Sequence, residues 1–207
     1  TAKRRSLTVT ALGKIPTPPR LIQRGVISDP ALAEEAIREL LTHSGVSAKH
    51  TILGLSTSDI LVRRHYMPAL NKRELRQALE FELPDLVSFS FESPKEVSYS
   101  FEVLHEDGSE MELLFVACKR SLIDPYLQSL RSSDLEPTVI DLQAFNWPRL
   151  PLEKQRVCFV DLGAHHTTVY VELEGVYKVY RVLPIGGYHI TQGIAAAFEC
   201  DEAQAVR

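Results

Sequence analysis

The chain has 207 residues, of which 44% are hydrophobic and 24% are charged, and its formal net charge is −4. These proportions are average for soluble globular proteins and exclude a disordered tail, a collagen-like repeat and a disulfide-stapled miniprotein. No apolar run approaches the roughly 20 residues that a transmembrane helix needs. The negative charge argues against a protein that binds nucleic acid through bulk positive charge, so we expect no nucleic-acid partner.

The two ends of the sequence are unusual for a complete protein. Thr1 stands where a methionine would start the chain, and Arg207 falls inside an expected helix. No positively charged segment followed by an apolar one predicts a secretory signal. We therefore expect the sequence to be a piece of a longer protein.

The first part of the chain predicts strands and helices in alternation. Strands are expected at residues 6–12, 51–55 and 60–66, and helices begin at Pro30 and just after Asn71. Asp29 is placed to cap the first helix and Gly45 to end it. The second helix has the residue types of a capping box, formed by Asn71 and Glu74.

The rest of the chain continues this mixture. Strands are expected at residues 96–104, 110–119 and 138–142, with a helix from Ser121, and beyond the boundary marked by Pro148 and Pro151 strands are expected at 156–161, 167–172 and 177–183 and a helix at about 189–198. The first of these groups makes a β-β-α-β unit whose hairpin turns at Asp107-Gly108. The order of elements indicates a mixed α/β (α+β) fold.

The sharpest local motif is the octapeptide Asp161-Leu162-Gly163-Ala164-His165-His166-Thr167-Thr168, which follows one apolar strand and turns directly into another. In a phosphate site, Gly163 would permit a tight reversal that brings backbone N–H groups near an anion. Asp161 would hold Mg²⁺ through water, and the hydroxyls of Thr167 and Thr168 would reach phosphate oxygens. The alternative is a plain hairpin whose Asp and Thr side chains bond their own backbone, and the octapeptide alone favours it.

Other chemical sites find little support. His165 and His166 are adjacent, and adjacent side chains on a strand point to opposite faces, which does not suit a shared metal ion. The three cysteines, Cys118, Cys158 and Cys200, form no CxxC pair. Cys118 and Cys158 lie in apolar runs, which predicts buried, reduced thiols and a cytosolic compartment. From the histidine and cysteine positions we expect no metal centre.

No GxSxG motif or catalytic triad is visible, so we expect no catalytic residues.

A basic cluster comprises Arg63, Arg64, His65, Lys72, Arg73 and Arg76. Strand alternation puts Arg63 and His65 on one face and Arg64 on the other. One interpretation is a solvated surface with local ion pairs. The other is a polar-lined groove for a peptide or for anionic lipid headgroups, and the residues leave both open.

Three groups of short motifs follow one another along the chain. The first is Ile60-Leu61-Val62-Arg63-Arg64-His65-Tyr66-Met67-Pro68 with Glu74-Leu75 and Phe81-Glu82-Leu83; the second is Val116-Ala117-Cys118-Lys119-Arg120 with Tyr126-Leu127-Gln128-Ser129-Leu130, Leu135-Glu136-Pro137 and Ile140-Asp141; the third is Val160-Asp161-Leu162-Gly163 with Arg181-Val182-Leu183-Pro184-Ile185-Gly186-Gly187 and Ile190-Thr191. In order and spacing, this series resembles the PilM family of type IV pilus assembly proteins.

The resemblance implies an actin-like (ribonuclease H-like) fold, related to that of the division protein FtsA. It implies a first actin-like subdomain at residues 1–84, an inserted β-β-α-β subdomain at 85–147 and the start of a second actin-like domain at 148–207. It also implies that a first phosphate loop of the DxG type precedes Thr1 and that the Gly-rich adenosine segment follows Arg207.

The resemblance further assigns phosphate binding to the hairpin. ATP would be held by Asp161, Gly163, Thr167 and Thr168, with Mg²⁺ held through Asp161. His165 and His166 stand where small residues are more usual. We therefore expect ATP to bind weakly and ATPase activity to be absent from this chain.

The function implied by the resemblance is that of a cytoplasmic scaffold, peripheral to the inner membrane and not spanning it. Its partners would be the cytoplasmic N-terminal tail of the membrane protein PilN and other proteins of the pilus platform. The tail would lie in a groove between the first actin-like subdomain and the inserted one. The residues expected to bind it are Arg64, Pro68, Leu79, Glu82, Leu83 and Tyr99.

Two alternatives share this architecture. One is the cytoplasmic domain of the type II secretion protein GspL, and the other is an ATPase closer to FtsA that polymerises. The full-length sequence would separate them, because a transmembrane helix beyond Arg207 indicates GspL and an amphipathic terminal helix indicates FtsA. The absence of both features would favour PilM.

Overall fold

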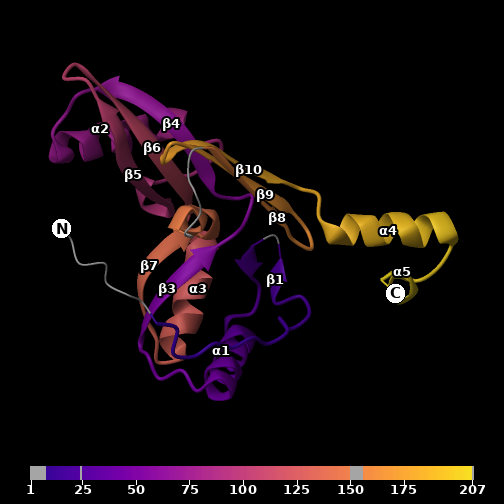
Figure 1. Cartoon of the computed structure of the whole chain (residues 1–207). Coiled ribbons are helices and arrows are strands. Elements are labelled where there is room, and N and C mark those ends of the chain that lie inside the picture. Colours follow the sequence, from indigo (N-terminus) through magenta and orange to yellow (C-terminus); the bar gives the residue numbers. More distant parts are fainter. Residues whose placement is uncertain (1–7, 24, 150–155, 207) are drawn as a thin grey trace. The chain divides into compact units, whose positions relative to one another are not determined.

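The structure is a computed structural model that describes residues 8–23, 25–149 and 156–206 (Figure 1). The chain forms two compact units. Unit 1 comprises Thr1–Leu53 and Ser121–Ile140, and unit 2 comprises Gly54–Arg120 and Asp141–Arg207. In the described ranges, no helix combines the length and the apolar character needed to cross a membrane.

Unit 1 is built mainly from two helices and four short or medium strands. These are β1 (Ile22–Gln23), β2 (Val26–Ile27), α1 (Pro30–Ser44), β3 (His50–Leu55), α3 (Arg120–Ser132) and β7 (Glu136–Leu142). The Asp29 side chain accepts from the first N–H groups of α1, and Gly45 ends the helix in the left-handed conformation with φ 67°. The two helices are joined because the Ser129 hydroxyl of α3 donates to the Pro30 carbonyl of α1 at 3.1 Å.

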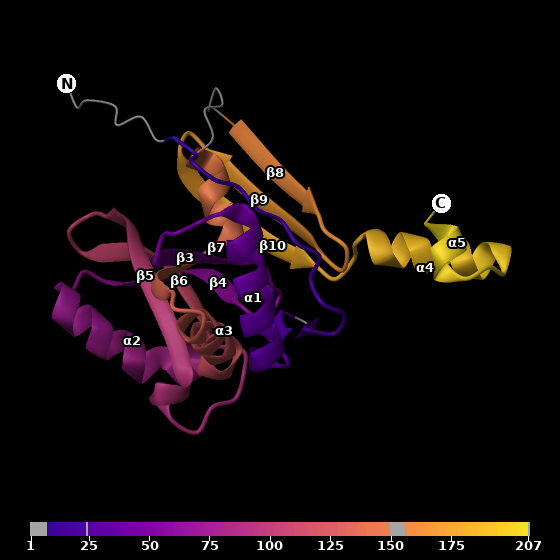
Figure 2. The same ribbon diagram turned by 90° about the horizontal axis from the view of Figure 1, so that it is seen from below.

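The first part of unit 2 is a three-stranded antiparallel sheet covered on one face by a helix (Figure 2). Its elements are β4 (Leu61–Pro68), α2 (Lys72–Leu86), the 3-10 turn η1 (Pro94–Glu96), β5 (Val97–Glu106) and β6 (Glu110–Lys119), in the sheet order β4-β6-β5. Alternate residues of β6, among them Leu113 and Phe115, are fully buried in one core with Leu79 and Leu83 of α2. The predicted capping box of Asn71 and Glu74 opens α2.

The second part of unit 2 is another antiparallel sheet, in the order β10-β9-β8. Its elements are the 3-10 turn η2 (Gln143–Arg149), β8 (Arg156–Leu162), β9 (Thr167–Leu173), β10 (Val176–Leu183), α4 (Gly187–Phe198) and α5 (Glu202–Ala205). The ring of Phe145 in η2 packs edge-on against Tyr170, Tyr177 and Tyr180, with centroids 5.7 to 6.0 Å apart. These contacts fix η2 over one face of the sheet.

Most expected elements form, but the strand expected at residues 6–12 is wrong in its described part. Residues 6 and 7 lie outside the described residues, and residues 8–12 form no regular structure. The side chains of Val9 and Leu12 are 82% and 89% exposed. Alternation alone does not make a strand when its apolar face meets no core.

The expected β-β-α-β unit is divided between two sheets. β6 is central between β4 and β5, so neither of its edges is free for β7, and β7 pairs with β3 instead.

The predicted burial of the cysteines is correct for Cys118 but wrong for Cys158, which is exposed. Cys158 shares a strand face with Arg156 and Val160, and that face of β8 is open. The boundaries expected at residues 84 and 147 stay predictions.

Candidate functional site

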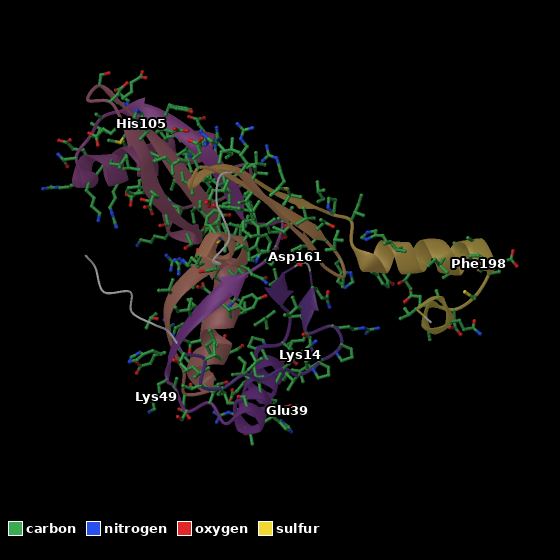
Figure 3. All side chains as sticks on the ribbon, in the orientation of Figure 1. Lys14, Glu39, Lys49, His105, Asp161 and Phe198 are labelled. Carbon is green, nitrogen blue, oxygen red and sulfur yellow. The ribbon has the colours of Figure 1, made fainter. Side chains whose placement is uncertain are left out.

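The β8–β9 hairpin brings together the residues predicted to bind phosphate (Figure 3 labels Asp161). Asp161 at the end of β8 is the register partner of Thr168, and Leu162 is the partner of Thr167. The N–H of Gly163 donates to the His166 carbonyl at 3.0 Å and closes the turn. A Cβ at position 163 would lie 2.8 Å from that oxygen, so the turn requires glycine.

The polar groups of this turn bond other groups of the protein. The Thr167 hydroxyl donates to the Ile185 carbonyl at 2.7 Å. The N–H groups of Gly187 and Tyr188, in the first turn of α4, donate to the carbonyls of Gly163 and Ala164 at 3.0 and 2.7 Å. In this arrangement the three donors are bonded to protein carbonyls and do not point toward a bound phosphate. The phosphate-binding role of Asp161, Gly163, Thr167 and Thr168 stays a prediction.

Gly186 lets α4 begin directly on the hairpin turn. A Cβ at this position would lie 2.5 Å from the Gly163 oxygen and 2.6 Å from the Ala164 oxygen. The Gly186 N–H donates to Nδ1 of His189 at 3.2 Å, which adds a side-chain bond at the start of the helix. The Gly186-Gly187 pair, which the sequence shows only as part of the third group of motifs, therefore joins the start of α4 to the turn.

Two neighbours of the hairpin were not expected from the sequence. The Ser56 hydroxyl lies 3.1 Å from Nε2 of His166 and 3.5 Å from the hydroxyl of Thr168, which is 2% exposed. Asp161 also lines a cavity of about 280 Å³ with Gln143, Trp147, Phe159 and Val160. Neither Ser56 nor the η2 residues belong to a recognisable motif. The described residues contain no group of three or more His, Cys, Asp or Glu side chains placed to hold a metal ion.

The six residues predicted to bind a peptide do not share one surface. Leu79 and Leu83 are 0% exposed and belong to the core between α2 and the sheet. Tyr99 lies on the same side of the sheet, where its ring stacks on Phe115 with centroids 5.9 Å apart and its hydroxyl donates to Glu80 at 3.3 Å. Burial, with the adjacent Glu80 carboxylate, raises the pKa of Tyr99.

Glu82 and Arg64 are both engaged inside unit 2. Glu82 accepts from Nε2 of His65 at 2.8 Å, and this bond joins α2 to β4. Arg64 lies on the opposite sheet face, where its guanidinium bonds the Glu112 carboxylate at 2.6 Å and the Tyr177 carbonyl. Pro68, on the same side of β4 as Arg64 by strand alternation, is exposed. The predicted division of the basic cluster between two faces is thus confirmed.

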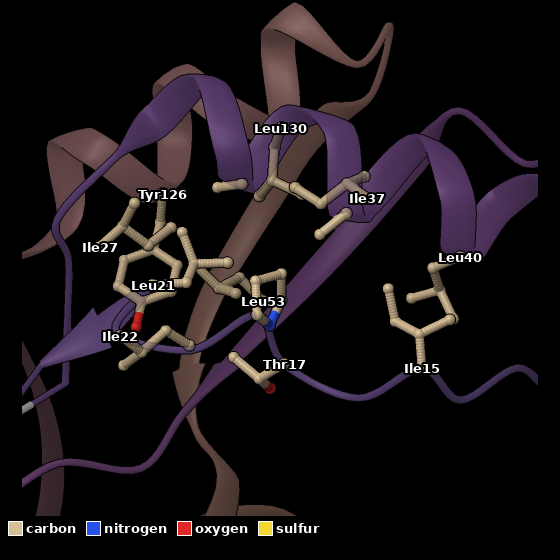
Figure 4. A pocket seen from close by; sticks show the side chains of 13 residues that line it. Ile15, Thr17, Leu21, Ile22, Ile27, Ile37, Leu40, Leu53, Tyr126 and Leu130 are labelled. Carbon is tan, nitrogen blue, oxygen red and sulfur yellow. The ribbon is translucent and has the colours of Figure 1, made fainter.

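Unit 1 contains an apolar pocket of about 230 Å³ that the sequence did not predict (Figure 4). Its lining residues are Ile15, Thr17, Pro18, Leu21, Ile22, Ile27, Ala33, Ala36, Ile37, Leu40, Leu53, Tyr126 and Leu130. The Tyr126 hydroxyl is engaged with the Gly25 carbonyl. The pocket therefore offers mainly aliphatic contact.

Comparison with known proteins identifies the family. The family model described as "Type IV pilus assembly protein PilM" matches residues 1–207. The chain belongs to the PilM family. No curated protein matched the chain in sequence.

Solved structures agree with this membership in PilM. A chain in the structure of a PilM-PilN type IV pilus biogenesis complex is 27% identical, with a TM-score of 0.82 over 94% of this chain and 60% of that chain. The present chain thus spans about 60% of that relative's length. The cytoplasmic domain of EpsL, an inner-membrane component of the type II secretion system of Vibrio cholerae, has a TM-score of 0.50 at 15% identity, over 82% of this chain and 63% of that chain. At that identity EpsL shows a shared fold alone. The mixed α/β fold class is confirmed at this level.

Proposed function

We propose that this chain is part of a scaffold of the type IV pilus inner-membrane platform and binds the cytoplasmic N-terminal tail of PilN. The observation that carries the proposal is the similarity, over almost the whole chain, to a chain of a PilM-PilN complex. The scaffold would be cytoplasmic and peripheral to the inner membrane, where it would contact other platform proteins. The alternatives, a GspL-type secretion protein and an FtsA-like polymerising ATPase, are less well supported because the PilM family model covers the entire chain.

The subdomain organisation belongs to the same proposal. The first actin-like subdomain would end near residue 84, the inserted subdomain near 147, and a second actin-like domain would begin at 148. The tail would bind near the junction of the first two, as an extended peptide.

Among the six candidate peptide-binding residues, four have side chains that a peptide can reach without unfolding the core. These are Arg64, Pro68, Glu82 and Tyr99. Leu79 and Leu83 have no exposed surface, so we propose that they support the site by holding α2 on the sheet. Glu82 is the best single test, since its carboxylate is partly exposed and accepts from Nε2 of the partly buried His65.

The test is a calorimetric titration with a synthetic peptide of the PilN tail from the same organism. Glu82→Lys should weaken binding about tenfold, equivalent to about 1.4 kcal/mol, because a charge at the site is reversed. Glu35→Lys, on an exposed position of α1, is the matched control with the same charge change. Unchanged affinity of a folded Glu82→Lys variant would remove Glu82 from the site, and no binding by the wild-type chain would contradict the function.

ATP with Mg²⁺ is proposed only as a structural or regulatory ligand of the family's fold. The hairpin would supply Asp161 and Thr168, but the donors of Thr167, Gly187 and Tyr188 are used within the protein. We therefore propose a non-enzymatic role for this chain and no tight binding of ATP to it.

A further inference from the structure

The apolar pocket of unit 1 opens to solvent along the segment that precedes α1. Ile15 and Ile22 line the pocket from this segment (Figure 4), and Ile22 is 45% exposed, whereas the lining residues Leu21 and Ala33 are buried. Protein cores leave few voids larger than a water molecule. A pocket of about 230 Å³ that opens to solvent therefore points to a ligand rather than to imperfect packing.

The size and the lining of the pocket fit a hydrocarbon chain. An apolar cavity of about 150 Å³ holds a benzene ring, so a pocket of about 230 Å³ accommodates an alkyl chain of several carbons. Among the described residues that line it, only Thr17 and Tyr126 have polar side chains, and the Tyr126 hydroxyl already donates to the Gly25 carbonyl. A polar group of a ligand would find few hydrogen-bond partners there, so the buried part of the ligand is apolar.

Two basic residues flank the open side of the pocket. Lys14 and Arg20 are exposed, and each immediately precedes a lining residue (Figure 3 labels Lys14). The Ser28 hydroxyl donates to the Arg20 carbonyl at 2.6 Å, which fixes the backbone there. Gly13, beside Lys14, packs so closely on α1 that a Cβ would lie 3.0 Å from Cδ1 of Leu40. Neither basic side chain forms a salt bridge with another described residue, so the two charges are placed to attract an anion.

We propose that this pocket binds the alkyl chain of an anionic amphiphile, a fatty acid or the acyl chain of an anionic lipid, with Lys14 and Arg20 beside the negative head. Each methylene that leaves water stabilises the complex, and the charged head stays in water next to the two cations. The proposal goes beyond peptide binding, because the pocket lies within unit 1 and all six candidate peptide-binding residues lie in unit 2. It therefore stands or falls separately from the proposed function.

The experiment titrates the chain by calorimetry with saturated fatty acids of increasing length, below their micellar concentrations. Each methylene buried in the pocket should tighten binding about fourfold, and the affinity should level off once the pocket is full. Ala36→Phe places a ring in the pocket and should weaken binding at least about tenfold. Ala31→Phe, at an exposed position of α1 outside the pocket, is the matched control and should bind within about twofold of wild type.

Charge variants give a second test that does not depend on how the core accepts a new ring. Lys14→Glu combined with Arg20→Glu, both at exposed positions, should weaken binding of a fatty acid about tenfold. The same double variant should bind the uncharged alcohol of equal chain length within about twofold of wild type, since the pocket itself is unchanged. Lys95→Glu combined with Lys178→Glu, at exposed positions of unit 2, is the matched control and should change neither affinity.

Vesicles distinguish the two sources of the ligand. Sedimentation of the chain with phosphatidylglycerol vesicles but not with phosphatidylcholine vesicles, lost in Ala36→Phe, would support a membrane lipid, and binding of the free acids alone would support a fatty acid. No binding of any fatty acid by the wild-type chain, or equal binding by wild type and both sets of variants, would overturn the proposal. Loss of PilN peptide binding in Ala36→Phe with unchanged fatty-acid binding would assign the pocket to a peptide side chain and would also overturn it.

Discussion

A Leu79→Ala variant distinguishes a structural role of Leu79 from a direct role in peptide binding. It was predicted to contact a peptide, but its side chain is 0% exposed and lies in the core formed by α2 and the β4-β6-β5 sheet. Leu79→Ala should therefore act on stability first. Phe81→Ala is the matched control on the same helix, since Phe81 is 88% exposed.

The expected magnitude follows from burial. Replacing a fully buried leucine with alanine costs about 2–5 kcal/mol, because apolar contact is lost and a cavity remains. A loss of about 3 kcal/mol in a chain of this size lowers the melting temperature by about 6–12 °C, at about 2–4 °C per kcal/mol. The exposed Phe81→Ala change should stay within about 0.5 kcal/mol.

The assay is thermal unfolding followed by far-UV circular dichroism, with peptide titration below the melting temperature of each variant. Because Leu79 is buried, we expect Leu79→Ala to melt well below wild type but to keep its peptide affinity within about twofold while it is folded. If Leu79→Ala has the melting temperature of wild type but no longer binds the peptide, Leu79 is not a core residue and the reasoning is refuted.

Three further predictions concern the hairpin and the aromatic core. Gly186→Ala should destabilise the chain by about 1–3 kcal/mol in thermal melts, because the new Cβ meets two carbonyl oxygens. The control is Gly193→Ala within α4, where a Cβ meets nothing within 4 Å; it should be neutral or stabilising by up to about 1 kcal/mol. Burial raises the pKa of Tyr170 and of Tyr180 to about 12, so their contribution to stability is complete below pH 10 and is lost as the pH rises from 10 to 12. Tyrosinate absorbance of Tyr170→Phe should therefore lack one late-ionising group that wild type shows. Millimolar Mg-ATP should leave the melting temperature unchanged, whereas ligand at 100 times its dissociation constant would add about 2.7 kcal/mol of stability.

Local signals in the sequence predicted local structure well. Asp29 and Asn71 cap the expected helices, because capping depends on a side chain and the N–H groups two or three residues away. The turn at Asp107-Gly108 forms with Gly108 at φ 93°, as the residue types indicate. The alternation of β4 correctly separated Arg64 from Arg63 and His65.

Contacts between distant segments were not predictable in the same way. β7 pairs with β3, a strand far away in the sequence, and not with β5 or β6, so its partner cannot be read from its own residues. Leucine is common both in protein cores and in apolar binding grooves. Only the packing of α2 on the sheet shows that Leu79 and Leu83 belong to a core. Ser56 and Gln143 come near the hairpin through the tertiary fold, with no motif to mark them.

The most direct measurement for the proposed scaffold function is calorimetric titration of the chain with the PilN tail peptide, beside a scrambled peptide of the same composition. We expect saturable binding of one native peptide per chain and no binding of the scrambled one. Equal binding of both peptides, or of neither, would contradict it.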